Sequence, residues 1–220
     1  MTDNEWLLPN NEQRVLIAGR TGSGKTQLGA FLLSRAPFDF QPYVIVDYKR
    51  DPLLNASNRI REIGYNELPK YPGLYIIHPD PSHVETMNNW LLNIWRKRNI
   101  GLYFDEIYMV PDKAGLSAIL TQGRALRIPA IVVTQRPAWL SRFALSETDH
   151  IAVFHLNDSE DRAKIGRLLP KGAADAIPPQ YHSIWYDVSR NKLFHLQPVP
   201  DGATILTDIE ARLAPRRRVI

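Results

Sequence analysis

The sequence predicts an α/β fold in which helices cover both faces of a mostly parallel central sheet, giving three layers. Runs of apolar, β-branched residues alternate along the chain with longer segments whose apolar residues recur at helical spacing. These runs are apolar throughout, which is typical of strands that crossover helices bury on both faces.

Six strands are expected in the main part of the chain, with helices between them. The strands are the runs RVLIA, YVIVD, LYIIH, IGLYFD, AIVVT and IAVFH, at residues 14–18, 43–47, 74–78, 100–105, 130–134 and 151–155. The helices are expected at residues 27–35, 83–98, 113–126 and 158–169. The second of these has Val84, Met87, Leu91 and Ile94 near helical spacing.

The C-terminal part has a different pattern. Two runs, at residues 182–189 and 192–197, flank a tight turn at Arg190-Asn191 and predict a C-terminal β-hairpin. A helix at residues 203–213 and a basic tail at Arg216–Arg218 follow. We expect the 220 residues to form one domain, with a core at about residues 14–170 and the hairpin, helix and tail at about 177–220.

The composition limits the classes of function. Hydrophobic residues make up 44% and charged residues 23%, which is enough to form a packed core. The chain has no cysteine, which excludes disulfides, thiolate metal sites and cysteine nucleophiles. No apolar stretch approaches the roughly 20 residues of a membrane helix, so we expect a soluble, intracellular protein with no transmembrane segment. The net charge of +4 is compatible with a polyanionic partner.

The strongest motif is a glycine-rich segment between the first predicted strand and the first predicted helix. It matches the pattern G-x-x-x-x-G-K-[ST] in full. Its glycines let backbone N–H groups point at phosphate oxygens, and the helix N-terminus adds partial positive charge. We expect its lysine to contact the β- and γ-phosphates of ATP and its threonine to bind Mg²⁺. The residues are Gly19, Arg20, Thr21, Gly22, Ser23, Gly24, Lys25 and Thr26.

A pair of carboxylates ends the strand predicted at residues 100–105. Asp105 would lie beside the phosphate loop, because ligands of parallel sheets bind at the carboxyl ends of strands. We expect Asp105 to hold Mg²⁺, partly through water, and Glu106 to act as general base on the attacking water. A further polar side chain, Gln135, follows the strand at 130–134 and is our candidate sensor of the γ-phosphate.

In order and spacing, the phosphate loop, the Asp105-Glu106 pair and Thr134-Gln135-Arg136-Pro137 resemble the FtsK/HerA superfamily of DNA-pumping ATPases. The segment from Val44 to Lys49, which ends in Asp-Tyr-Lys, is similar to the second strand of that superfamily. The resemblance covers about residues 14–170. It implies a P-loop NTPase fold of the RecA-like (ASCE) type.

A short chain of this kind resembles the genome-packaging ATPases of tailless icosahedral viruses with an internal membrane. The resemblance implies a homo-oligomeric ring, a hexamer when active, that moves double-stranded DNA into a preformed capsid through a vertex or portal protein. It also implies a location in the host cytoplasm or the virion. A plasmid, conjugation or cellular DNA-processing motor is the alternative.

Ring motors usually complete each site with an arginine from the neighbouring subunit, which stabilises charge on the transferring phosphate. Our candidate is Arg142, which follows the sensor strand; Arg124, Arg127 and Arg162 are the alternatives. DNA would be gripped through its phosphate backbone, which requires only basic side chains. The candidates for that role are Lys49, Arg50, Lys113, Arg136 and the tail Arg216–Arg218.

Three other classes of P-loop protein are less consistent with the motifs. A small-molecule kinase needs no water-activating glutamate such as Glu106, because its acceptor is the substrate hydroxyl. A guanine-nucleotide switch requires the pattern N-K-x-D, and Asn191-Lys192-Leu193-Phe194 lacks the aspartate. A module that binds ATP without hydrolysis would not need Lys25, Thr26, Asp105 and Glu106 together.

Overall fold

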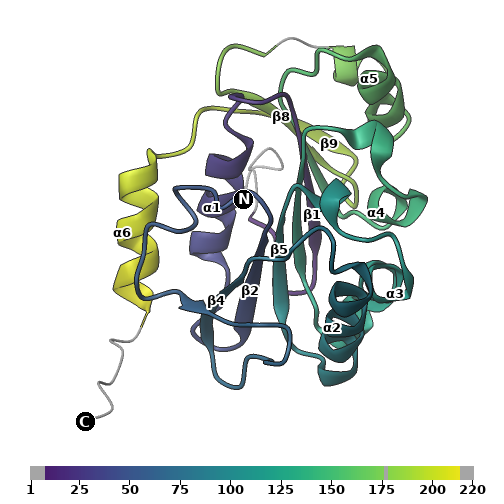
Figure 1. Ribbon diagram of the computed structural model, residues 1–220. Coiled ribbons are helices and arrows are strands. Elements are labelled where there is room, and N and C mark those ends of the chain that lie inside the picture. Colours follow the sequence, from purple (N-terminus) through teal and green to yellow (C-terminus); the bar gives the residue numbers. More distant parts are fainter. Residues whose placement is uncertain (1–7, 176–177, 214–220) are drawn as a thin grey trace.

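A nine-stranded sheet forms the centre of the molecule in the computed structural model, which describes residues 8–175 and 178–213 (Figure 1). The strand order is β3-β4-β2-β5-β6-β1-β7-β8-β9. All pairs from β3 to β7 are parallel, and β8 and β9 are added antiparallel at one edge. The strands are β1 (Arg14–Ala18), β2 (Pro42–Asp47), β3 (Arg61–Glu62), β4 (Gly73–Ile77), β5 (Gly101–Asp105), β6 (Ala130–Thr134), β7 (His150–Val153), β8 (Ser183–Asp187) and β9 (Lys192–Leu196).

Helices cover both faces of this sheet, so the predicted three layers are confirmed (Figure 1). One face carries α1 (Lys25–Arg35) and α6 (Gly202–Arg212), which pack against each other. The other face carries α2 (Val84–Lys97), α3 (Ala114–Gln122), α4 (Arg142–Ser146) and α5 (Ser159–Gly166). Short 3-10 turns lie at Ile107–Met109, Arg124–Leu126, Pro137–Trp139 and Ala173–Asp175.

Each face of the sheet has its own hydrophobic core, which explains why the strands are apolar at every position. Along β1, Leu16 and Ala18 belong to the core beneath α2 and α3, whereas Val15 and Ile17 belong to the core beneath α1 and α6. All five residues of β1 are buried, as are those of β5 and β6. Successive side chains along a strand point to opposite faces of the sheet, and here both faces are hydrophobic cores instead of one core and one solvent-facing surface.

The register of the parallel strands brings the predicted motifs to one edge. Strand β6 lies between β1 and β5, with Ala18 opposite Thr134 and Phe104 opposite Val132. On the other side of β5, Asp105 lies opposite Asp47 of β2. The acidic strand is thus separated from the phosphate-loop strand by the sensor strand, as expected for a RecA-like (ASCE) P-loop NTPase. The loops after β1, β6, β5 and β2 consequently meet at the carboxyl edge of the sheet.

Several boundaries differ from the sequence prediction for local reasons. The helix predicted at 113–126 ends at Gln122, because Gly123 starts a tight turn in which it accepts a hydrogen bond from the N–H of Ile128. The strand predicted at 151–155 is shorter in the structure and ends at Val153, although backbone bonds from Phe154 to Ala18 and from Arg20 to the carbonyl of His155 follow it. The helix predicted at 158–169 ends at Gly166.

Two elements were not predicted, and the terminal hairpin has an additional role. Strand β3 has two residues, both exposed, and α4 is barely more than one turn, so neither has a recognisable period. The predicted hairpin is present as β8 and β9, but β8 also pairs with β7 and extends the main sheet.

No helix among the described residues is long and apolar enough to cross a bilayer. The basic tail Arg216–Arg218 lies outside the described residues.

Gly101 provides a test of the packing between β2 and β5. It lies opposite Tyr43 in the sheet, and a Cβ at position 101 would lie 2.2 Å from Cε1 of that tyrosine. We expect Gly101→Ala to lower the free energy of unfolding by about 1–3 kcal/mol through overpacking. Gly166→Ala is the control, because its Cβ would meet only Ala174, at 3.5 Å. Urea denaturation measures both; equal stabilities would contradict this description of the interface.

Candidate active site

The phosphate loop turns tightly and is closely packed, so several of its positions require glycine. Gly22 and Gly24 have φ angles of 75° and 101°, which favour glycine. At Gly19, a Cβ would lie 2.6 Å from the Cβ of Phe154, so the loop lies directly against the end of β7. Backbone bonds from Gly19 to Thr134 and from Arg20 to His155 fix the loop to the two neighbouring strands.

The N-terminus of α1 is open to an anion. Gly24 is its N-cap, no side chain caps it, and its first turn has no acidic residue. Free N–H groups and the positive end of the helix dipole therefore point out of the loop. The amine of Lys25 is buried and donates to the carbonyl of Arg20 at 3.1 Å. Burial lowers the pKa of Lys25, and the nearby carboxylate of Glu106 partly offsets this effect.

A cavity of about 470 Å³ joins the phosphate loop to the acidic strand. It brings Lys25 and Thr26 together with Asp105 and Glu106, as the sequence predicted. Residues from the loop after β2 and from the segment before β8 complete its wall, namely Lys49, Asp51, Leu53 and Tyr181. A second cavity of about 260 Å³ shares Gly24, Gln27 and Tyr181 with it and is otherwise lined largely by apolar residues, including Phe154 and Pro198.

Asp105 is a buried carboxylate with an unsatisfied oxygen. Asp105 is only 2% exposed, and its Oδ1 has no hydrogen-bond partner in the structure. Burial, followed by repulsion from Glu106, Asp47 and Asp51, raises the pKa of Asp105 to about 7. A group in this state is stabilised by a cation, because a positive charge nearby favours the ionised form.

Glu106 is held in a strained conformation with both carboxylate oxygens occupied. It is buried, and its φ of 59° is uncommon for a residue with a side chain. Its Oε1 accepts from Nζ of Lys49 at 2.5 Å, and its Oε2 accepts from the backbone N–H of Gln135 at 3.0 Å. Glu106 is thus connected both to the sensor strand and to the loop after β2.

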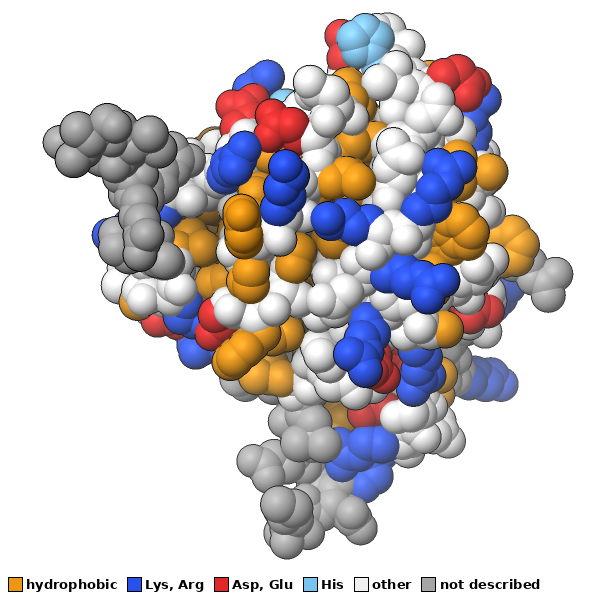
Figure 2. Space-filling model, turned by 90° about the horizontal axis from the view of Figure 1, so that it is seen from below, with side chains coloured by type: hydrophobic (Ala, Val, Ile, Leu, Met, Phe, Trp, Pro, Cys, Tyr) orange, Lys and Arg blue, Asp and Glu red, His pale blue; other side chains and the backbone are white. Residues whose placement is uncertain are grey.

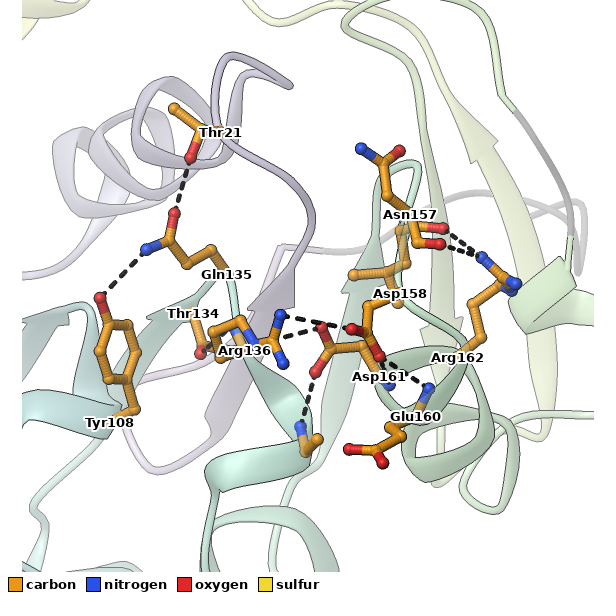
Figure 3. Close-up of polar contacts among 12 residues, drawn as sticks. Thr21, Tyr108, Thr134, Gln135, Arg136, Asn157, Asp158, Glu160, Asp161 and Arg162 are labelled. Atoms are coloured by element: carbon orange, nitrogen blue, oxygen red, sulfur yellow. Dashed lines mark hydrogen bonds and ion pairs between the residues drawn. The ribbon is translucent and has the colours of Figure 1, made fainter.

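Gln135 contacts both nucleotide motifs. Figure 3 shows its side chain between Thr21 and Tyr108. Its side-chain oxygen accepts from the hydroxyl of Thr21 in the phosphate loop at 2.6 Å. Its side-chain amide donates to the hydroxyl of Tyr108 at 3.0 Å. Through its backbone it also contacts Glu106. Gln135 can therefore respond to a change at either motif.

Arg136 is held within the chain, which bears on its predicted role in DNA binding. Its guanidinium lies 3.4 Å from Asp158 and 3.6 Å from Asp161 (Figure 3). It also lies over the ring of Trp139, 4.8 Å from the ring centroid. Lys113 is likewise paired, with Glu85 at 2.5 Å. Arg136 and Lys113 would both have to break these ion pairs to reach DNA. The side chain of Arg142, our candidate for the trans arginine, lies outside the described part of the structure.

Three contributors to the site were not assigned a role from the sequence. Tyr108 orients Gln135, Tyr181 covers Gly24, and Asp47 organises the loop that carries Lys49. Asp47 is fully buried at the end of β2, and its carboxylate accepts from the N–H groups of Lys49 and Asp51. Only Asp47 had a recognisable signal, since it ends an apolar strand as Asp105 does.

The fold and this site define a P-loop ATPase in which the sensor strand β6 lies between the phosphate-loop strand β1 and the acidic strand β5. No protein-family profile matches the chain. The DNA packaging ATPase P9 of Enterobacteria phage PRD1 is 37% identical to it over 210 residues, covering 90% of this chain and 92% of P9. The chain therefore belongs to the family of DNA packaging ATPase P9.

Solved structures have the same fold at lower sequence identity. The genome packaging NTPase B204 of Sulfolobus turreted icosahedral virus 2, solved with AMPPCP, superposes with a TM-score of 0.70 at 19% identity. That match covers 87% of this chain and all of B204. The pCW3 conjugation coupling protein TcpA, solved with ATPγS, gives 0.59 at 15% identity, covering 89% of this chain and 64% of TcpA. The fold is thus shared by viral packaging and conjugation proteins.

The raised pKa of Asp105 predicts a dependence of stability on pH. The pKa of Asp105 is about 7 in the folded protein and has an ordinary value of 3.8. The folded state therefore binds a proton more tightly than the unfolded state, and the free energy of unfolding falls as the pH rises from about 3.8 to about 7. We expect nucleotide-free Asp105→Asn to become progressively more stable than the natural protein from pH 4 to pH 8. Each pKa unit corresponds to about 1.4 kcal/mol.

Thermal unfolding across this pH range measures the effect, at roughly 2–4 °C per kcal/mol for a chain of this length. Asp112→Asn is the control, because Asp112 is exposed and lies outside the buried strand β5. A difference between Asp105→Asn and the natural protein that does not change with pH would contradict the burial of a protonated Asp105.

Proposed function

We propose that this chain hydrolyses ATP to move double-stranded DNA into a viral capsid. The observation that carries the proposal is the single cavity in which the phosphate loop meets a buried aspartate and a hydrogen-bonded glutamate. The relationship of the chain to DNA packaging ATPase P9 supports DNA as the substrate that is moved. We further propose that the chain works as one motor domain.

The donor set fits a magnesium–ATP complex. Thr26 supplies a hydroxyl and Asp105 an unpartnered buried oxygen on the same cavity, and both are hard oxygen ligands of the kind that Mg²⁺ prefers. The described residues contain no cluster of three His, Cys, Asp or Glu side chains that could hold a metal. This supports a metal that is bound jointly by the protein and the phosphates. When bound, Mg²⁺ would neutralise charge on the phosphates and on Asp105.

The chain's own residues divide the work of hydrolysis. The N–H groups of the loop and Lys25 would bind and orient the phosphates. Glu106 would take a proton from the attacking water, and Gln135 would report the γ-phosphate through its contacts with Thr21 and Glu106. The second cavity, beside Tyr181 and Phe154, would hold the adenine base, since it adjoins the phosphate loop and is largely apolar.

Charge on the opposite edge of the sheet supports a polyanionic partner. Figure 2 views the molecule from the amino ends of the strands, and Lys and Arg side chains outnumber Asp and Glu on this face. Five exposed residues in neighbouring turns contribute, Arg96, Lys97, Arg98, Arg124 and Arg127. Such a surface attracts a phosphate backbone without reading its sequence. A capsid vertex or portal protein would be the second partner, in the host cytoplasm or the virion.

The ring and its trans-acting arginine are also proposals. Arg142, at the start of α4, is our first candidate for a residue that enters the site of the next subunit. Arg124 is the second, because its side chain is 61% exposed at the edge of the sheet opposite its own phosphate loop. Arg162 has a local role, donating to the carbonyls of Leu156 and Asn157.

Glu106→Gln tests the proposed chemistry. We expect the natural protein to release phosphate slowly alone and faster with long double-stranded DNA, and the variant to bind ATP with almost no release. Phosphate release measured with and without DNA decides the matter. Full activity of Glu106→Gln without any effect of DNA would refute both the general base and the translocase, and transfer of phosphate to a small acceptor would indicate a kinase.

Mixed rings test the trans arginine. Arg142→Ala should reduce turnover by roughly 10³-fold or more. Adding Lys25→Ala subunits, which cannot hydrolyse ATP but carry Arg142, should restore part of that activity. The same mixture with Arg124→Ala identifies which arginine acts in trans. Rescue of Arg124→Ala alone would transfer the role to that residue, and rescue of neither would contradict sharing of sites between subunits.

A further inference from the structure

We propose that Asp161 of α5 is a positioning residue that holds the sensor Gln135 in place and thereby sets the rate of ATP hydrolysis. The inference rests on the proposed function, because it takes Gln135 as the sensor of the γ-phosphate. It starts from a buried carboxylate that does not line the nucleotide cavity. Asp161 is only 2% exposed, although it lies in the first turn of α5.

Two carboxylates hold the segment that follows β6, one at each end. The backbone N–H of Gln135 donates to Oε2 of Glu106 at 3.0 Å. Pro137 has no N–H, and the N–H of Ala138 donates to Oδ1 of Asp161 at 2.9 Å. Glu106 thus holds the segment on the nucleotide side, and Asp161 holds it on the side of α5.

The side chain between these two bonds reaches the same helix. Nε of Arg136 lies 3.6 Å from Oδ2 of Asp161, and its Nη1 lies 3.4 Å from Oδ2 of Asp158. Asp158 is the N-cap of α5 and accepts from the N–H groups of Glu160 and Asp161, so both carboxylates are fixed to the start of the helix. Figure 3 shows Gln135 directed toward the phosphate loop and Arg136 directed toward α5.

These bonds act where the surroundings are not closely packed. A polar cavity of about 310 Å³ lies beside the segment, and its lining includes Thr21, Gln135, Arg136, Asp158 and Asp161. Side chains that border such a space have fewer neighbours to fix them than side chains in a close-packed core. Burial of a carboxylate costs free energy unless donors satisfy it, and Asp161 meets this cost through the segment after β6.

Gln135 depends on this placement, because its side chain bridges two other groups. Its oxygen accepts from the hydroxyl of Thr21, and its amide donates to the hydroxyl of Tyr108. A displacement of about 1 Å would break hydrogen bonds of this length. The phosphates, by contrast, are expected to bind to the loop N–H groups and Lys25. Loss of Asp161 should therefore slow turnover without weakening nucleotide binding.

Asp161→Ala tests the inference by separating turnover from binding. We expect kcat for ATP hydrolysis to fall by roughly 10- to 100-fold, because a misplacement of about 1 Å can have an effect of this size. The affinity for a non-hydrolysable ATP analogue should be unchanged. Asp161→Asn should restore most of kcat, since its amide oxygen can still accept from Ala138. Glu160→Ala is the matched control, because it removes the same charge from an exposed residue in the same turn.

A double-mutant cycle with Gln135→Ala distinguishes positioning from a general loss of stability. Gln135→Ala alone should lower kcat, and Asp161→Ala should then have little further effect, since no sensor side chain is left to position. Thermal unfolding measures the stability of each variant separately. If Asp161→Ala does not fold, Asp161→Glu replaces it in the cycle, because the extra methylene displaces the carboxylate from the N–H of Ala138 but keeps its charge.

The outcomes separate this inference from the proposed function. Absence of ATP hydrolysis by the natural protein would refute both. Full kcat in Gln135→Ala would refute the sensor and the role of Asp161, and would leave the general base and the translocase intact.

Three results would overturn the positioning role of Asp161 alone. The first is a folded variant at position 161 in the cycle with normal kcat, and the second is additive effects of the changes at positions 135 and 161. The third is a joint loss of kcat and analogue affinity. An Asp161→Asn variant as slow as Asp161→Ala would refute the bond to Ala138 as the contact that positions the sensor.

Discussion

The parallel register of β1, β6, β5 and β2 is the constraint on which the site depends. Because these four neighbouring strands end at one edge, the loops after β1, β5 and β2 converge on a single cavity. The loop after β6 reaches the same residues through the bonds of Gln135 to Thr21 and Glu106. A different functional group follows each strand: backbone N–H donors follow β1, an amide follows β6, two carboxylates follow β5 and a lysine follows β2. The apolar character of the strands, which places them between two cores, is what allows polar chemistry to be confined to their tips.

At this edge, negative charge exceeds what the protein neutralises by itself. Asp47, Asp51, Asp105 and Glu106 lie near one another, as the pKa of Asp105 reflects, and Lys25 and Lys49 are the lysines in the described structure that line the same cavity. Asp47 is satisfied by backbone and side-chain donors, whereas Asp105 retains an unpartnered oxygen. The site is therefore less stable empty than it would be with neutral side chains, and its ligands supply the compensating interactions.

Much of this arrangement could be predicted from the sequence, because local patterns determine it. The phosphate loop has a fixed spacing, buried strands have an apolar signature, and the carboxyl ends of parallel strands must coincide. These rules are enough to expect Gly19–Thr26, Asp105 and Gln135 at one edge of the sheet, and they lie there in the structure, while their roles stay predictions. The ion pair between Lys49 and Glu106 could not be predicted, because it depends on how Asp47 folds the loop after β2. Tyr108 was missed for a similar reason, since its contact with Gln135 arises from a short turn after the acidic pair.

The segment that follows Gln135 is fastened to α5. Asp161 accepts from the N–H of Ala138 at 2.9 Å and pairs with Arg136, which also contacts Asp158 at the start of the helix. The tip of β6 and the start of α5 are therefore joined by charged and hydrogen-bonded contacts. A shift of Gln135 at the phosphate loop would in this way be passed on to a helix that has no contact of its own with that loop in these bonds.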